Sequence, residues 1–324
     1  MTSIAKKALI CIAIVLPLAG GAQLREKFQA HATYLASDEL KGRGTGSEGI
    51  RLAAKYIATQ FKEIGLEPGL EKSYYQEFPF PEQQQPEANI VGVIKGAATT
   101  KKSIVFTAHY DAYGVIKKEE QNDSIYNGAL DNAIGVAALI EIARLFAEQE
   151  APECHLVFVA TAAEEFGAYG SKFYVENPVF PIEDIIICLN IDGFNVSGVR
   201  EDYFVFPKRG VDYVDQIEAI AKPLGWVYKS PGWEDQLNTS FDTASFLQRS
   251  VPALTLWTGD QLKGGKTAEP IPFGKIHSPE DEITALWNWE GVEDHCLLYK
   301  AIADYFLNNP SDIKVTEPSL FMEK

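Results

Sequence analysis

The sequence predicts an α/β protein in which helices cover both faces of a largely parallel sheet. Apolar runs rich in β-branched residues begin at Ser103, Leu156 and Ile185, and such runs are typical of strands that are buried on both faces. Segments with apolar residues at helical spacing separate the runs. Strands that alternate with helices in this way favour a largely parallel sheet.

Two helices are expected in the first part of the chain. Leu24–Ala36 is the first, and a glycine-rich loop follows it. Apolar residues then recur at helical spacing from Ile50 to Ile64, and Gly65 with Pro68 beyond it is typical of a helix end. This second helix is amphipathic, so one of its faces is expected to pack against another part of the protein.

Strands and helices alternate along the rest of the chain. Tyr75–Pro86 is aromatic and proline-rich and is expected to be an irregular or an edge segment. The expected strands are then Asn89–Lys95, Ser103–Ala108, the run from Leu156, Ile185–Ile191, Tyr203–Pro207 and Pro252–Trp257. The expected helices lie around Val136–Ala143, before Glu176, at Val211–Leu224, after Asp242 and at Ala285–Leu307. No internal repeat or obvious linker interrupts this order, so residues 23–324 are expected to form a single domain.

Residues 1–22 have the pattern of a secretory signal peptide. Lys6 and Lys7 precede the apolar run Ala8–Leu18, and small residues follow it. The apolar run is too short to span a bilayer. Cleavage is expected after Ala22, which predicts a secreted or periplasmic protein with no membrane anchor after cleavage.

The composition excludes some classes of partner. The chain has 324 residues, 46% of them hydrophobic, which is enough for a substantial core. Its formal net charge of −16 disfavours nucleic acid and anionic membranes, because both bind clustered lysine and arginine. After signal cleavage, Cys154, Cys188 and Cys296 remain, which leaves open either one disulfide or only buried free thiols.

Chemically active side chains follow several of the predicted strands. Two adjacent acids, Glu164 and Glu165, end the run from Leu156, while a histidine and an aspartate end two other strands. In sheets of this type, sites gather beyond the carboxyl ends of the strands. The side chains expected to converge there are His109, Asp131, Glu165, Asp192 and His277.

These five side chains suit a centre with two Zn²⁺ ions in which one carboxylate bridges the ions. Asp131 is the expected bridge. One ion would take His109, Asp131 and Asp192, and the other would take Asp131, Glu165 and His277. Each ion would then have three protein ligands and an open position for water.

Two further acids have separate expected roles. Asp111 is expected to accept the proton on the other ring nitrogen of His109 and so to fix the tautomer of that histidine. Glu164 is not a ligand and is expected to act as the general base, which takes a proton from the attacking water and returns it to the leaving amine. The remaining histidines are interpreted as structural: His31, His155 and His295.

Five spaced runs occur in a fixed order between His109 and Asp281: HYDAY, GALDNAIGVAALIEIAR, TAAEEFGAYGSKFYV, LNIDGF and HSPED. An earlier run, LASDELKGRGTGSEGIRLAAKYIATQFKEIGLEPG, begins at Leu35. Together they closely resemble the di-zinc aminopeptidase family of secreted metallopeptidases, which also contains glutamate carboxypeptidases, glutaminyl cyclases and the transferrin receptor. The resemblance implies a three-layer, zinc-exopeptidase-like fold with a twisted mixed sheet that is parallel at its centre. It implies the same five zinc ligands, Glu164 as the general base, Asp111 behind His109, and a cis peptide bond after Asp131.

The chain departs from the family's pattern at two places. Ile134 stands where the family usually has serine, and Phe241-Asp242-Thr243 stands where it commonly has Ser-Asp-His. The long polar segments Ser230–Ser240 and Gly259–Lys275 are expected to form the rim or a lid of the cleft and to select substrates. They contain no tyrosine, so neither of them supplies an obvious oxyanion donor.

The sequence therefore predicts a zinc-dependent exopeptidase. The favoured activity is that of an aminopeptidase, which would hydrolyse N-terminal peptide bonds with a zinc-bridging hydroxide. A dipeptidase or carboxypeptidase on the same scaffold should place a cation for the substrate carboxylate, and Arg200, Arg209 and Lys229 are the candidates. A glutaminyl cyclase needs only one zinc, so the complete ligand set disfavours it. A catalytically inactive binding module should lack ligands or the base, whereas all six positions are filled.

Overall fold

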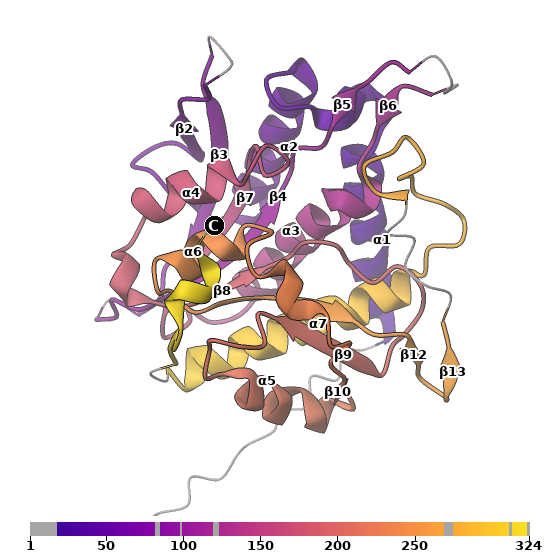
Figure 1. Ribbon diagram of the computed structural model, residues 1–324. Helices are drawn as coiled ribbons and strands as arrows, with labels where there is room; N and C mark the ends of the chain where they lie inside the picture. Colours follow the sequence, from indigo (N-terminus) through magenta and orange to yellow (C-terminus); the bar gives the residue numbers. More distant parts are fainter. Residues whose placement is uncertain are drawn as a thin grey trace, which may run out of the picture.

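The computed structural model describes residues 18–81, 85–97, 99–118, 123–268, 275–310 and 313–322. Within this part of the chain, the largest sheet has nine strands in the order β1-β3-β7-β4-β8-β11-β9-β10, and β2 pairs with β3 (Figure 1). Its strands are β1 (Glu67–Pro68), β2 (Tyr75–Phe78), β3 (Glu87–Ile94), β4 (Ser103–His109), β7 (His155–Thr161), β8 (Ile185–Asn190), β9 (Asp202–Phe206), β10 (Val227–Tyr228) and β11 (Ala253–Thr258).

The centre of this sheet is parallel and its outer strands are mixed. β7, β4, β8 and β11 run parallel to one another, while β3 and β9 pair antiparallel with the two sides of this group. Every residue of β4 and of β8 is buried, which explains their unbroken apolar sequences. The predicted mixed sheet with a parallel centre is confirmed.

Helices cover both faces of the sheet. They are α1 (Leu18–Leu35), α2 (Glu48–Ile64), α3 (Ile134–Ala147), α4 (Tyr169–Glu176), α5 (Val214–Ala221), α6 (Thr243–Gln248) and α7 (Trp289–Asn308). On one face, Phe106 and Phe158 belong to a core that α1, α2, α3, α5 and α7 complete. On the other face, Val105 and Val157 pack with residues of α4 and α6. Because neighbouring residues of a strand point to opposite faces, each central strand contributes to both cores.

Helix α2 has the ends that its sequence predicts. The Ser47 side chain accepts a hydrogen bond from the backbone N–H of Ile50 at the first turn. At the other end, Gly65 is left-handed with φ 93°, and its N–H returns to the carbonyls of Phe61 and Lys62. This closure ends the helix at Ile64.

Two helices begin at positions other than those expected. Helix α1 begins at Leu18, before the expected first residue Leu24. Helix α7 begins at Trp289 rather than at Ala285, because the Asn288 side chain accepts the N–H of Gly291 at 2.7 Å and caps the helix there.

Two short hairpins lie outside the large sheet. Strand β5 (Gly114–Val115) pairs with β6 (Ile125–Tyr126), and β12 (Gln261–Leu262) pairs with β13 (Lys266–Thr267). The second hairpin falls in the segment Gly259–Lys275, in which the sequence predicts no strand.

The predicted signal peptide falls largely on residues 1–17, which lie outside the described residues. Helix α1 starts before the expected cleavage point at Ala22. In the part of the chain that the structure describes, no helix has both the length and the apolar composition needed to cross a membrane. Cys154, Cys188 and Cys296 are buried free thiols, so the alternative with a disulfide is wrong.

Candidate metal centre

Three neighbouring parallel strands carry side chains of the predicted site to one edge of the sheet. His109 is the last residue of β4, and Asp192 lies two residues beyond the end of β8. Glu164 and Glu165 follow β7 after a turn in which Ala163 has φ 58°. The strand itself therefore ends before the two acids, and the turn aims them.

The other two side chains come from outside the sheet. Asp131 lies in a single π-helical turn, Ala129–Ala133, that leads into α3. His277 lies on the loop before α7 and has φ 58°. The peptide bond between Asp131 and Asn132 is cis, as the resemblance implied.

The structure brings all five side chains together in two groups that share Asp131. In the first group, Nε2 of His109 lies 3.0 Å from Oδ1 of Asp131 and 3.5 Å from Oδ1 of Asp192. In the second, Nε2 of His277 lies 2.9 Å from Oδ2 of Asp131 and 3.4 Å from Oε2 of Glu165. The two oxygens of Asp131 thus face different groups. One imidazole and two carboxylates in each group form a donor set that suits a divalent ion such as zinc.

The surroundings of His109 fit a metal ion. Its side chain is only 1% exposed, and Nε2 makes no hydrogen bond although two carboxylates face it. A buried polar atom without a partner costs free energy, and binding of a cation to the lone pair of this nitrogen would remove that cost.

The carboxylates of the two groups and the neighbouring carboxylate of Glu164 lie close together and are largely shielded from water, and their pKa values reflect this. Burial, reinforced by neighbouring carboxylates, raises the pKa of Glu164 and of Asp192, and it raises the pKa of Glu165 to about 8. Burial also acts on Asp131, but its close contacts with the imidazoles of His109 and His277 outweigh burial and lower the pKa of this residue. Concentrated negative charge in a buried site is stabilised by a bound cation.

Asp111 contacts different partners from those that its sequence position suggested. Nδ1 of His109 faces the backbone carbonyl of Asp111 at 3.3 Å, whereas the carboxylate is 3.8 Å away. The carboxylate instead accepts the backbone N–H groups of Glu164, at 3.1 Å, and of Glu165, at 3.3 Å. Asp111 therefore fixes the His109 ring through its main chain and the two glutamates through its side chain.

Asp281, in the HSPED run, was not singled out from the sequence. Its carboxylate accepts the N–H of Leu130 at 2.8 Å and the N–H of Asp131 at 3.0 Å. Its backbone carbonyl accepts the N–H of Ala129 at 3.1 Å. Asp281 thus holds the turn that carries Asp131, the aspartate shared by the two groups. Burial raises the pKa of Asp281 to about 6.

Arg43 is a second residue that sequence analysis missed. Its guanidinium is fully buried and donates to the carbonyls of Tyr110 at 2.8 Å, Asn127 at 2.7 Å and Gly128 at 2.9 Å, and also to that of Leu35. The carbonyls of Tyr110, Asn127 and Gly128 belong to the segment after β4 and to the turn before Asp131, while that of Leu35 ends α1. Arg43 therefore joins these two segments to the end of α1. The glycines beside Arg43 in the sequence were the signal that could have pointed to it.

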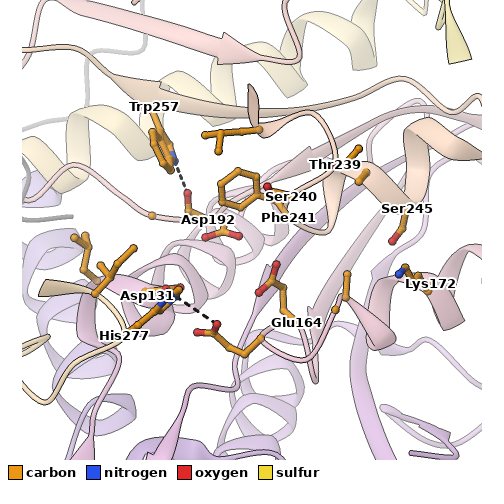
Figure 2. A pocket seen from close by; sticks show the side chains of 18 of the residues that line it. Asp131, Glu164, Lys172, Asp192, Thr239, Ser240, Phe241, Ser245, Trp257 and His277 are labelled. Atoms are coloured by element: carbon orange, nitrogen blue, oxygen red, sulfur yellow. Dashed lines mark hydrogen bonds and ion pairs between the residues drawn. The ribbon is translucent and has the colours of Figure 1, made fainter. Parts of the chain in front are cut away.

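A cavity of about 620 Å³ opens over the two groups, and Glu164 points into it (Figure 2). Its wall includes the aromatic side chains of Trp233, Phe241 and Trp257. The Trp257 indole N–H donates to the backbone carbonyl of Asp192 at 2.6 Å, which ties this wall to the first group. The cavity therefore combines a carboxylate-rich floor with an apolar side.

The segment Ser230–Ser240 contributes to the cavity as expected. The lining residues from it are Trp233, Leu237, Thr239 and Ser240. The described part of Gly259–Lys275 does not line the cavity, and residues 269–274 lie outside the described residues.

The cations considered for a substrate carboxylate lie elsewhere. Arg200 donates to the carbonyl of Gly259 at 3.0 Å, and Arg209 and Lys229 face acidic side chains. None of the three lines the cavity. Among the described residues that line it, Lys172 is the one lysine or arginine.

The three histidines interpreted as structural lie apart from both groups. His31 contacts the buried carboxylate of Glu141 at 3.0 Å. His155 and His295 each stack on a phenylalanine with ring centroids 4.1 Å apart. Neither metal-binding group includes any of them.

Comparison with known proteins supports the family suggested by the motifs. The sequence model of peptidase family M28 matches residues 89–301. A vacuolar membrane protease of Candida dubliniensis is 29% identical over 256 residues, which are 72% of this chain and 25% of that protein. A probable zinc metalloprotease of Pyricularia oryzae is 30% identical over 148 residues, which are 45% of this chain and 28% of that protein. The chain thus spans about a quarter of the length of these relatives.

Solved structures share the fold. A zinc-dependent exopeptidase from Parabacteroides distasonis superposes with a TM-score of 0.64 at 18% identity, covering 88% of this chain and 98% of that one. A zinc aminopeptidase from Bacillus subtilis superposes with a TM-score of 0.63 at 15% identity, covering 88% and 94%. At these identities the likeness concerns the architecture alone.

Proposed function

Because the chain belongs to peptidase family M28, we propose that it is a zinc-dependent aminopeptidase that removes N-terminal residues with apolar side chains. The observation that carries the proposal is the pair of ligand groups that share Asp131 beneath a cavity with an aromatic wall. We further propose that it acts outside the cytoplasm, on the basis of residues 1–22.

Zinc bound at the two groups would polarise the scissile carbonyl and lower the pKa of the attacking water. His109 and Asp192 would hold one ion, Glu165 and His277 the other, and Asp131 both. These are the ligands proposed from the sequence. The distances of 2.9–3.5 Å between their imidazole nitrogens and carboxylate oxygens are compatible with that role.

Glu164 moves the proton in the proposed reaction. Its carboxylate points into the cavity and lies outside both ligand groups, so it is available to accept the proton of the attacking water and pass it to the leaving amine. The Asp111 carboxylate accepts the backbone N–H groups of Glu164 and Glu165, which fixes the turn that carries the base.

The charges around the cavity favour a substrate with a free amino group. Four carboxylates line it, those of Asp131, Glu164, Glu165 and Asp192. Zinc bound at the two groups would offset the charge of Asp131, Glu165 and Asp192, whereas Glu164 belongs to neither group and its carboxylate would attract an α-ammonium group. The side chain of the N-terminal residue would lie against Trp233, Phe241 and Trp257, where apolar surface leaves water.

One observation favours a second candidate, a peptidase that recognises a substrate carboxylate. Lys172 lines the same cavity, and in Figure 2 it lies on the other side of Glu164 from His277. A cation in this position could contact the terminal carboxylate of a dipeptide. The glutaminyl cyclase alternative gains no such support, since the ligand set is complete for two ions.

A substrate panel separates these candidates. Aminoacyl-arylamides with leucine, phenylalanine, lysine or glutamate, N-acetylated peptides, dipeptides and N-terminal glutamine peptides are incubated with the zinc-loaded protein. The proposal predicts cleavage of the leucine and phenylalanine arylamides at least about tenfold faster than of the charged ones, and no cleavage of acetylated peptides. Cleavage restricted to dipeptides or to acetylated peptides would reject the aminopeptidase, and failure to bind zinc would favour the inactive module.

A further inference from the structure

His277 needs a neighbour that fixes its ring. It lies on a loop rather than on a strand, and its side chain is 46% exposed, compared with 1% for His109. Nε2 of His277 must nevertheless face Asp131 and Glu165 at the same time. A ring with this freedom loses rotational entropy when it binds a cation, unless another group has already set its orientation.

Tyr113 makes that contact. Its ring centroid lies 4.6 Å from that of His277, with an angle of 47° between the planes. Its hydroxyl oxygen lies 3.4 Å from Nδ1 of His277, on the side of the imidazole opposite to Asp131. The same hydroxyl interacts with the Glu165 carboxylate. A phenol carries its proton at neutral pH, so this hydroxyl can donate.

The backbone around Tyr113 is closely packed. A methyl group on Gly44 would lie 3.0 Å from Cα of Gly114, the residue after Tyr113. Gly42 has φ 65°, and a methyl group there would lie 2.4 Å from the carbonyl oxygen of Tyr126 and 2.7 Å from that of Gly114. The glycine-rich segment near the amino terminus therefore supports the segment that carries Tyr113, and so limits how far the tyrosine can shift.

We propose that Tyr113 is a positioning residue that ties His277 to Glu165 within the second ligand group. The inference rests on the proposed two-ion centre. A neutral imidazole that presents Nε2 to a cation carries its proton on Nδ1. This N–H donates to the Tyr113 oxygen, and the Tyr113 O–H donates to the Glu165 carboxylate, so one hydroxyl orients two ligands.

The first group is held differently, which makes the inference specific. Nδ1 of His109 faces a backbone carbonyl, that of Asp111, at 3.3 Å. Removal of the Tyr113 hydroxyl should therefore weaken binding at the group of Asp131, Glu165 and His277 and leave the group of His109 unchanged. Loss of a partner behind a metal ligand typically lowers metal affinity by about 10–100-fold.

The test is zinc binding by Tyr113→Phe, measured by competition with a chromogenic chelator. This variant keeps the ring against His277 and removes only the hydroxyl. The matched control is Tyr126→Phe, since Tyr126 lies beside Tyr113 with ring centroids 6.3 Å apart and belongs to neither ligand group. The thermal unfolding midpoints of the metal-free wild type and variants show whether each protein is folded, independently of activity.

In Tyr113→Phe, we expect one of two zinc affinities to fall by about 10–100-fold and the other to stay within about threefold of wild type. We expect Tyr126→Phe to keep both affinities. Unchanged affinities in Tyr113→Phe, equal loss at both sites, or the same loss in the control would each overturn the inference. If the wild-type protein itself binds fewer than two zinc ions, the proposed function fails, and that result is distinguishable because it does not involve the variant.

Discussion

At the scale of single residues, Asp111 holds different partners with its side chain and with its backbone. Its carboxylate accepts the N–H groups of Glu164 and Glu165, while its carbonyl faces His109. The Asp111 side chain therefore fixes the position of Glu164, the proposed base. The ring of His109 is held by the Asp111 backbone instead.

Asp111→Ala tests this division. Loss of the carboxylate frees the turn that carries Glu164, and a displacement of about 1 Å can lower the rate by about 100-fold. We expect kcat at saturating zinc to fall by about 10–100-fold and zinc affinity by less than about fivefold. Asp111→Asn keeps one acceptor oxygen and should lie between alanine and wild type. The opposite pattern, weaker zinc binding with kcat retained, would show that the carboxylate acts on His109 after all.

The residue types of the site could be predicted from the sequence because strand ends are local features. Each of His109, Glu165 and Asp192 follows a buried apolar run, and the parallel arrangement of those runs places them together. The supporting roles of Arg43 and Asp281 could not be predicted in this way. They depend on hydrogen bonds to backbone groups up to 151 residues distant, which no local pattern encodes.

At the scale of elements, the ends of helices are decided by single residues. Gly65 ends α2 with φ 93°, and a methyl group added there would meet no atom within 4 Å. Substitution therefore changes only the backbone energy, since no neighbour obstructs the new side chain.

Gly65→Ala should lower the free energy of unfolding by about 1 kcal/mol, because an L-residue in the left-handed conformation is strained. Gly65→Asn should lower it by less, since asparagine tolerates this conformation better. Chemical denaturation of the two variants and the wild type measures the difference. Equal stability of Gly65→Ala and wild type would contradict this account of the helix end.

The sequence predicted long buried elements better than short or capped ones. The strands of the parallel centre were expected within a few residues of where they lie, because apolar content alone marks them. Helix α7 was expected to begin at Ala285, since the periodicity does not reveal that Asn288 caps the helix. The hairpin β12–β13 was missed because its strands have two residues each and half-exposed or exposed side chains.

For the whole molecule, buried titratable groups make stability depend on pH. Among them is His295, which is fully buried against Phe194 and whose pKa burial lowers to about 3. In the unfolded chain the histidine has its ordinary pKa near 6.5. Between these two values the unfolded state binds the additional proton, so the free energy of unfolding falls as the pH falls from about 6.5 to about 3.

His295→Phe should reduce this dependence. The variant keeps an aromatic ring against Phe194 but cannot titrate, so the slope of unfolding free energy against pH should decrease by up to about 1.4 kcal/mol per pH unit in that window. Denaturation of both metal-free proteins in the presence of a chelator separates this effect from metal binding. Parallel curves for the two proteins would mean that His295 is not held neutral.

The proposed mechanism requires that Glu164 moves the proton while the neighbouring side chains hold zinc. Glu164→Gln has nearly the same shape as wild type but cannot accept a proton, so it separates the two roles.

The most direct measurement is therefore zinc content and turnover of a leucine arylamide in wild type and Glu164→Gln, side by side. We predict close to two zinc ions per chain in both proteins and a kcat at least about 100-fold lower in the variant. Retention of most of the turnover by Glu164→Gln, or loss of its zinc together with its activity, would contradict the account.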